Sequence, residues 1–277
     1  MKKLSKYIEF ATTLLKQAVQ ERKFRYGNTT LKYMYQPYKG SDRLLVVFSA
    51  CTRPGIPARY NYMRTLKDVP VNRLFILDDF GEDHRGGYYL GAYPDFEMEK
   101  ATKALIDKFI ARPEVSKVCF GGSSKGGWAA LNFGVQYAGR GLGAEIITGA
   151  PQYWLGTYLQ TPGGMVTLQS IAASKKKEDL AVVSAALNAH LKQRIEGNEY
   201  AHGQTIYIHY SEHEHTYRDH IKYLIADLKS GGGIALSRMF ESMRIMEMSV
   251  FISLVSLSAA CVTYSLPNHK VRIVDVH

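Results

Sequence analysis

Cysteine is scarce in this sequence, with three cysteines among 277 residues. Cys51, Cys119 and Cys261 are far apart, and none belongs to a C-x-x-C pair. This number and spacing exclude a small domain held by disulfides and a thiolate zinc site. We therefore expect a protein of a reducing compartment, cytoplasmic and without a bound metal.

The sequence also lacks an uninterrupted apolar leader, an internal repeat and a low-complexity linker. Residues 1–6 are basic, but residues 8–19 include Glu9 and Lys16 and have helical periodicity. A signal peptide would have an unbroken apolar core at this place. We predict an amphipathic N-terminal helix within residues 1–28 of a cytoplasmic protein, which could lie peripherally at the inner face of the membrane.

Acidic residues are in the minority, because 25 Asp and Glu face 35 Lys and Arg, giving a formal net charge of +10. The basic residues are dispersed, and their one run, Lys175 to Lys177, is explained by a solvated loop. A positive field concentrates anionic partners, such as a phosphate-bearing cofactor or an acidic polymer. Nucleic acid is not expected, because no RNA- or DNA-binding motif is present.

Apolar runs of strand length alternate with helical patterns along the chain. Strands are predicted at residues 43–49, 73–77, 117–120, 144–148 and 205–210, with an edge strand at 29–38. Helices are predicted at residues 95–110 and 127–136, with a pair between 165 and 194. This alternation is typical of an α/β fold with a mainly parallel sheet and helices on both faces.

A G-x-S-x-G pattern, residues 122–126, follows one of these strands and precedes a helix. In that context the central serine, Ser124, is held at a sharp turn that requires glycine neighbours. The pattern predicts an α/β-hydrolase fold with Ser124 as the nucleophile. A glycine-rich turn that binds phosphate is the alternative.

A serine nucleophile needs a base, which is usually a histidine oriented by a carboxylate. In this fold the acid follows the nucleophile and lies in the loop after a late strand. The loop at residues 211–216 contains Glu212 and Glu214, and we choose Glu214 as the acid. His213, Glu214 and His215 could instead form a solvated charged cluster or a metal site.

The oxyanion of an acyl-transfer reaction needs amide donors. One donor is predicted to be the backbone N–H of Lys125, at the start of the helix, and the other to come from Ala50 or Cys51, after the strand at residues 43–49. The Lys125 ammonium has two alternatives, contact with an anionic substrate or exposure to solvent.

Several sequence blocks recur together between residues 30 and 230. They are Val46-Val-Phe-Ser-Ala50, Tyr60-Asn-Tyr62, Leu77-Asp-Asp, Arg85-Gly-Gly-Tyr-Tyr89, Gly122-Ser-Ser-Lys-Gly-Gly127 and Gly149-Ala-Pro-Gln152. Together these blocks resemble those of bacterial capsule polysaccharide O-acetyltransferases with an α/β-hydrolase fold, and of the XcbB/CpsF capsular biosynthesis and accessory Sec secretion acetyltransferase families.

The resemblance implies acetyl transfer from acetyl-CoA, through an acetyl-serine, to a hydroxyl of an anionic capsular or surface polysaccharide. By this resemblance Ser124 is the nucleophile and Glu214 the acid of the triad, while Arg85 has a substrate-binding or a structural role. Other capsule biosynthesis proteins are expected partners. The resemblance places the catalytic domain at residues 29–230.

The histidine that the resemblance implies is absent, because residues 231–266 contain none. In a displaced reading frame, the codons of Met243 to Val250 can encode Glu-Asn-His-Gly-Asp-Val. This requires AGA for Arg244, ATC for Ile245, GAG for Glu247 and TCN for Ser249, and the histidine depends on the ATC codon. We therefore hypothesise a single-nucleotide frameshift near Ser242, within an atypical C-terminal tail at residues 231–277 whose later part would be aberrant. Residues 248–266 are uncharged and long enough to span a membrane, a reading that their serine content disfavours.

Three functions remain open on sequence alone. The first is the serine-dependent acetyltransferase that the resemblance implies. The second is a serine carboxylesterase or deacetylase, because water can resolve an acyl-serine as readily as a sugar hydroxyl can. The third is a catalytically impaired hydrolase-fold protein that binds partners in polysaccharide biosynthesis or secretion.

Overall fold

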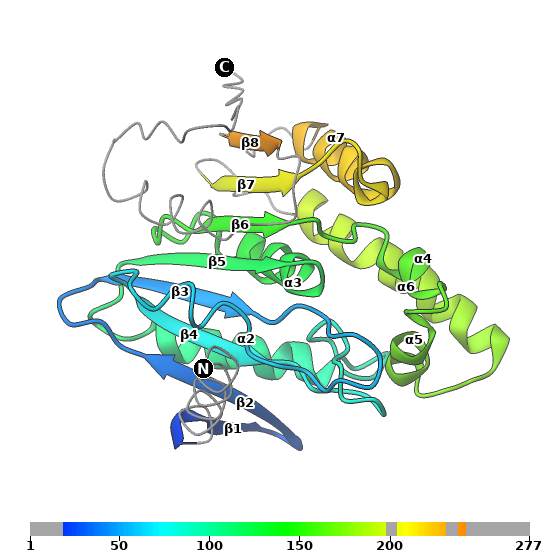
Figure 1. The fold of residues 1–277 in the computed structure, drawn as a ribbon, viewed down its shortest axis with the longest axis horizontal. Coiled ribbons are helices and arrows are strands. Elements are labelled where there is room, and N and C mark those ends of the chain that lie inside the picture. Colours follow the sequence, from blue (N-terminus) through cyan, green and yellow to red (C-terminus); the bar gives the residue numbers. More distant parts are fainter. Residues whose placement is uncertain (1–18, 198–203, 231–237, 242–277) are drawn as a thin grey trace, which may run out of the picture.

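A single mixed sheet organises the protein (Figure 1). The computed structural model describes residues 19–197, 204–230 and 238–241. Within them, eight strands lie in the order β1-β2-β4-β3-β5-β6-β7-β8. The strands are β1 (Arg22–Tyr26), β2 (Thr29–Gln36), β3 (Arg43–Phe48), β4 (Asn72–Leu77), β5 (Lys117–Ser123), β6 (Glu145–Gly149), β7 (Thr205–Tyr210) and β8 (Arg238–Glu241).

The sheet is parallel from β4 to β8 and antiparallel at its other end, where β1 pairs with β2 and β2 with β4. The prediction of a mainly parallel sheet is therefore confirmed. The strand predicted at residues 29–38 is present as β2, but its predicted place at the edge of the sheet was wrong, because β1 covers that edge. Its sequence, Arg-Lys-Phe-Arg-Tyr, carries too little apolar surface to be recognised as a strand, and it lies within the segment predicted as the N-terminal helix.

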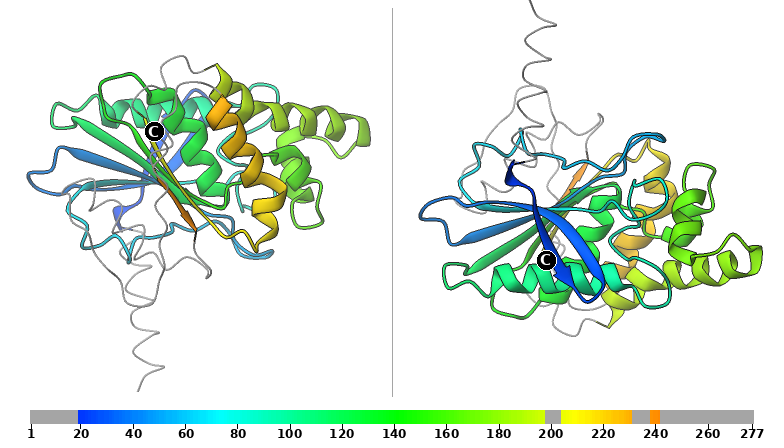
Figure 2. Two further views of the ribbon diagram at one scale, coloured as in Figure 1. Left: turned by 90° about the horizontal axis from the view of Figure 1, so that it is seen from above. Right: turned by 90° about the horizontal axis from the view of Figure 1, so that it is seen from below.

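Helices of the described residues pack on one face of the sheet (Figure 2). They are α2 (Glu97–Ile110), α3 (Lys125–Gly134), α4 (Leu155–Leu159), α5 (Met165–Ala172), α6 (Lys177–Glu196) and α7 (Lys222–Ser230), with a 3-10 turn at Val135–Tyr137 and a π-helical turn at Tyr217–Ile221. Alternate strand residues, such as Val46, Phe120 and Ile146, face these helices in the larger core. The sequence predicted helices on both faces of the sheet, whereas the helices of the described residues lie on one face.

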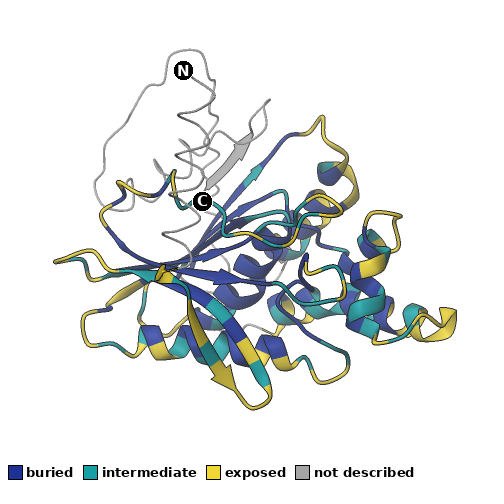
Figure 3. Cartoon of the chain, turned by 60° about the horizontal axis from the view of Figure 1, so that its bottom comes forward, coloured by how far each residue is buried: buried dark blue, intermediate teal, exposed yellow. Residues whose placement is uncertain are grey.

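The opposite face is covered by the irregular segment between β3 and β4. Leu66, Val69 and Val71 from this segment pack against the other set of strand residues, including Val47 and Phe75. The central strands are buried on both sides for this reason, as Figure 3 shows by their dark blue colour. Their continuous apolar runs are what a strand covered on two faces requires.

Parallel strands that run in register bring their carboxyl ends to one edge of the sheet. Ser123 at the end of β5 lies beside Gly149 at the end of β6, which lies beside His209 of β7. The loops that follow β3, β4, β5, β6 and β7 therefore converge at this edge. Ligand sites of open α/β sheets lie outside these carboxyl ends.

Two sequence predictions lie outside the described residues: the helix at residues 8–19, apart from its last residue, and the tail from residue 242 with its proposed frameshift. Among the helices that are described, none is both long enough and apolar enough to cross a membrane.

His220 joins the turn before α7 to the loop after β6. Its Nδ1 accepts a hydrogen bond from the Trp154 N–H at 3.2 Å, and burial lowers the pKa of His220 to about 4. Because its ordinary pKa is 6.5, the unfolded chain binds more protons than the folded chain between pH 6.5 and 4. The stability contributed by neutral His220 is therefore present above pH 6.5 and is lost as the pH falls toward 4.

We expect the free energy of unfolding, measured with urea, to fall between pH 7.5 and pH 5 by on the order of 1 kcal/mol more in the native chain than in a His220→Asn variant. Asparagine keeps an acceptor for the Trp154 amide and does not titrate in this range. Equal pH dependence of the two chains would contradict the assignment.

Candidate active site

Ser124 is the single residue between β5 and α3, and its backbone has a positive φ, with φ 50° and ψ −119°. A positive φ is costly for a residue with a side chain, and it persists at functional turns where the surroundings enforce it. Here the Ser124 N–H donates to the Gly149 carbonyl at 2.8 Å, and the Ser124 carbonyl accepts from the Trp128 N–H at 2.9 Å. Strand, turn and helix are thus arranged as the elbow motif requires.

The glycines beside Ser124 are required by close backbone contacts. A Cβ on Gly126 would lie 2.5 Å from the Phe48 carbonyl oxygen, and a Cβ on Gly122 would overlap the backbone of Gly126. Gly127 packs equally closely on β6, where a Cβ would lie 2.7 Å from the Thr148 hydroxyl oxygen. A side chain at Gly126 or Gly127 would push the elbow away from β3 or β6, and one at Gly122 would push apart the two sides of the turn itself.

The Lys125 side chain is fully buried and is part of the framework of the elbow. Its ammonium lies 3.0 Å from Asp78 Oδ2, 3.0 Å from the Asp78 carbonyl oxygen and 2.9 Å from the Arg85 carbonyl oxygen. Both sequence-based alternatives for this ammonium, substrate contact and exposure to solvent, were wrong. They failed because the partner, Asp78, is 47 positions earlier and converges on Lys125 only in the folded sheet.

Asp78 holds the loop after β4 against the elbow. Its Oδ1 accepts from the N–H groups of Phe80 and Gly87, and its Oδ2 accepts from Tyr89 N–H as well as from Lys125. Gly86, at φ 100°, lies so close to the Lys125 ammonium that a Cβ would overlap it. The block at residues 85–89 is therefore shaped around this buried ion pair.

Arg85 is 8% exposed and its guanidinium is committed to protein groups. Its Nε donates to the Thr52 carbonyl at 2.9 Å, one Nη lies 3.2 Å from Cys51 Sγ, and the other lies 3.5 Å from Asp83. Of the two roles left open for Arg85, these contacts favour the structural one. Arg85 fixes the loop that follows β3.

The predicted oxyanion loop does lie beside the elbow, but one of its amides is occupied. The Ala50 N–H donates to Asn61 Oδ1 at 2.9 Å, so Ala50 is wrong as an oxyanion donor in this conformation. For the N–H groups of Cys51 and Lys125, the described residues provide no acceptor. These two amides remain the candidate donors.

Gln152 was not predicted as a site residue, although it lies in the block 149–152. It is 3% exposed and its Nε2 donates to Ser124 Oγ at 3.1 Å. Its Oε1 accepts from the buried Tyr88 hydroxyl at 3.2 Å. Glutamine belongs to no catalytic motif of this fold, so only the recurrence of the block could have drawn attention to it.

Ser123, the other serine of the elbow, has a different environment. Its hydroxyl forms a short hydrogen bond with the Tyr62 hydroxyl, and burial raises the pKa of Tyr62. Tyr62 packs with the core on the face of the sheet opposite α3. Ser123 is thus tied to the β3–β4 segment, whereas Ser124 contacts Gln152.

Glu214 lies in the predicted loop after β7 and is exposed. Its carboxylate accepts from the Thr216 hydroxyl at 3.3 Å. Within residues 19–197 and 204–230, no histidine is hydrogen-bonded to Ser124 or to Glu214. The assignment of Glu214 as the triad acid therefore stays a prediction.

The described histidines near the carboxyl ends of the strands lie in environments that do not include Ser124. His209 of β7 is half-buried, and burial lowers its pKa while nearby Glu214 opposes the shift. His84 lies 3.4 Å from the Asp79 carbonyl oxygen, and His220 accepts from Trp154. In the part of the chain with assigned positions, no group of three or more His, Cys, Asp or Glu side chains could hold a metal ion.

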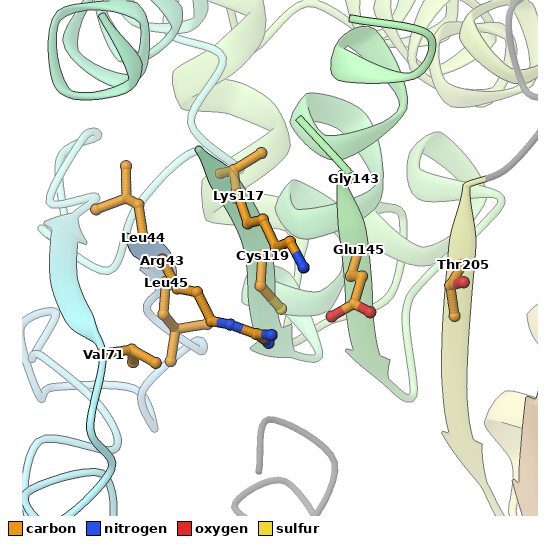
Figure 4. A pocket seen from close by; sticks show the side chains of 10 residues that line it. Arg43, Leu44, Leu45, Val71, Lys117, Cys119, Gly143, Glu145 and Thr205 are labelled. Carbon is orange, nitrogen blue, oxygen red and sulfur yellow. The ribbon is translucent and has the colours of Figure 1, made fainter. Parts of the chain in front are cut away.

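A small cavity of about 180 Å³ lies at the other end of the strands (Figure 4). It is lined by residues at the amino ends of β3, β5, β6 and β7, among them Arg43, Lys117, Glu145 and Thr205. Ser124 follows the carboxyl end of β5. This cavity is therefore separate from the candidate catalytic serine.

Solved structures similar to this chain have the α/β-hydrolase fold. A capsule O-acetyltransferase of Neisseria meningitidis serogroup A is similar over 86% of this chain and 93% of its own, with 20% identity and a TM-score of 0.69. A histidine-to-alanine variant of that enzyme has been solved with CoA. An S-formylglutathione hydrolase from Agrobacterium tumefaciens is similar over 86% and 92% of the two chains, with 12% identity and a TM-score of 0.55.

A glycosylation-associated protein complex from Streptococcus agalactiae is also similar, over 86% of this chain but 46% of its own, with 18% identity and a TM-score of 0.61. No protein family profile and no curated protein sequence matches this chain. The sheet order, the elbow at Ser124 and these structural similarities define an α/β-hydrolase fold, as the sequence predicted.

Proposed function

We propose that this chain is a serine-dependent O-acetyltransferase that moves an acetyl group from acetyl-CoA, through acetyl-Ser124, to a hydroxyl of capsular or other surface polysaccharide. The observation that carries the proposal is the positive φ of Ser124, enforced between a strand and a helix. That conformation places the serine next to the Lys125 amide at the start of α3, for which the described residues provide no acceptor, and acyl transfer requires such an arrangement.

In the first step, Ser124 Oγ attacks the thioester carbonyl carbon as a base removes its proton. The amides of Cys51 and Lys125 stabilise the negative charge on the carbonyl oxygen. The new Oγ–C bond forms, the C–S bond breaks, and the proton leaves with the CoA thiol. In the second step a sugar hydroxyl attacks the acetyl-serine, its proton is removed by the same base, and Ser124 recovers a proton.

The donor and the acceptor are supported by different observations. Acetyl-CoA is supported by the likeness to the meningococcal capsule enzyme, a variant of which was solved with CoA. An anionic acceptor polymer is supported by the same likeness and by the net charge of +10, which also suits the phosphates of CoA. The likeness to the Streptococcus agalactiae complex supports protein partners.

The identity of the general base depends on the sequence that follows Ser242. We keep Glu214 as the acid and place the histidine in the displaced reading frame near Ser242. A chain without that histidine would transfer acetyl groups slowly, because Ser124 would lose its proton acceptor. The codon of Ile245 tests this directly: ATC permits the histidine, and ATT or ATA excludes it.

Acetyl-CoA consumption tests the function itself. We expect release of CoA thiol to require both the chain and an anionic capsular polysaccharide, and acetyl esters to appear on the polymer. Thiol release that is unchanged by polymer, with free acetate as the product, would instead identify an esterase. No thiol release and no acetyl-Ser124 by mass spectrometry would favour the impaired binding protein.

A further inference from the structure

Gln152 has three polar contacts on one buried side chain next to the candidate nucleophile. Its Nε2 lies 3.1 Å from Ser124 Oγ and 3.1 Å from the Ala150 carbonyl oxygen. Its Oε1 lies 3.2 Å from the Tyr88 hydroxyl. A buried amide held at both ends has one orientation available to it.

The Ala150 contact decides which end of the amide faces Ser124. A backbone carbonyl oxygen can only accept, so the Gln152 atom beside it is the NH₂ nitrogen. The second hydrogen of that nitrogen points to Ser124 Oγ, while Oε1 accepts from Tyr88. Ser124 Oγ is therefore the acceptor in this bond, and its own hydrogen is left for a base.

The backbone around this contact is held in unusual conformations. Ala150 has φ 43° and Tyr88 has φ 57°, both in the left-handed region. Tyr88 is 2% exposed, and its ring packs edge-on against Trp128 of α3 at 5.7 Å between centroids. The loops after β4 and β6 thus meet at Gln152 and present its amide to the elbow.

We propose that Gln152 is a catalytic hydrogen-bond donor to Ser124 Oγ and that Tyr88 positions it; this inference rests on the proposed function. When the acetyl-serine gives up its acetyl group to a hydroxyl, the Oγ–C bond breaks and its electron pair stays on Oγ. The proton lost by the attacking hydroxyl then reaches Oγ through the base. An N–H already directed at Oγ stabilises its negative charge in this step.

The experiment follows acetyl-Ser124 by intact mass after mixing with p-nitrophenyl acetate, and measures its formation and its loss separately. We expect a Gln152→Leu variant to lose the acetyl group about tenfold to a hundredfold more slowly than the native chain. The control is Gln160→Leu, because Gln160 donates to a serine hydroxyl, that of Ser184 at 2.7 Å, outside the site. It should match the native chain within about twofold.

The Tyr88→Phe variant distinguishes a role of Tyr88 in positioning Gln152 from a general loss of protein stability. It should slow acetyl loss severalfold in the native chain and have no further effect in the Gln152→Leu background, because the two residues act through one bond. If Gln152→Leu does not fold, Gln152→Glu replaces it, since a carboxylate cannot donate. Native rates in a folded Gln152 variant overturn the inference alone. Absence of acetyl-Ser124 in a chain that carries the displaced-frame histidine overturns the proposed function, and the inference with it.

Discussion

In a chain that carries the displaced-frame histidine, Ser124→Ala is expected to lower acetyl transfer, and covalent labelling by a fluorophosphonate, by a factor on the order of 10⁴ to 10⁶. No other hydroxyl takes the place of Ser124 Oγ, which projects from the turn between β5 and α3 and accepts from Gln152 at 3.1 Å. Alanine and serine both carry a Cβ and tolerate the positive φ at this position equally, so the fold should be retained. Labelling followed by peptide mass spectrometry, with a melting curve, measures both expectations.

The neighbouring serine provides the matched control. Ser123→Ala removes a hydroxyl one position away, which bonds to Tyr62 and faces the opposite side of the sheet. Its labelling rate should stay within about tenfold of the native rate. Labelling that persists in Ser124→Ala and disappears in Ser123→Ala would move the nucleophile to Ser123.

The largest loss of stability is expected for Lys125→Met, about 3 to 5 kcal/mol in the free energy of unfolding. Methionine fills a similar volume but leaves the fully buried Asp78 carboxylate without its cation. It also leaves the carbonyl oxygens of Asp78 and Arg85 without the donor that Lys125 supplies. Urea unfolding at pH 7.5 measures the change.

Lys100→Met is the control, because it removes the charge of a lysine that is ion-paired but exposed. Lys100 pairs with Glu97 at 3.1 Å, close to the 3.0 Å of the buried pair, but both side chains are about half exposed. Its loss should cost less than about 0.5 kcal/mol, because water and salt screen an exposed pair. Similar costs for the two substitutions would mean that the Asp78–Lys125 pair does not hold the elbow.

The predictions that succeeded depended on local pattern. The runs at residues 44–48 and 73–77 predicted buried strands because a strand covered on two faces has no polar face to interrupt its sequence. The elbow at Ser124 was predicted correctly because strand, glycines and helix follow one another directly along the chain. Both features are fixed by residues within about ten positions of each other.

The predictions that failed depended on residues distant in sequence. The burial of Lys125 is decided by Asp78, and the occupation of the Ala50 amide by Asn61. β1 is a short polar strand whose pairing, not its composition, makes it a strand. Gln152 acquires its contact with Ser124 because β5 and β6 are neighbours in register, which no spacing along the chain reveals.

The burial of Lys125 also changes what the sequence Gly122 to Gly127 signifies in a related chain. Four of its six residues are constrained by the architecture: the glycines by backbone approach and the lysine by Asp78. A descendant that had lost its base, and with it all catalysis, would still need those four to fold. The presence of this hexapeptide in another protein therefore indicates a shared ancestor and a shared fold. Assigning catalysis to that protein requires that its proton acceptor be identified as well.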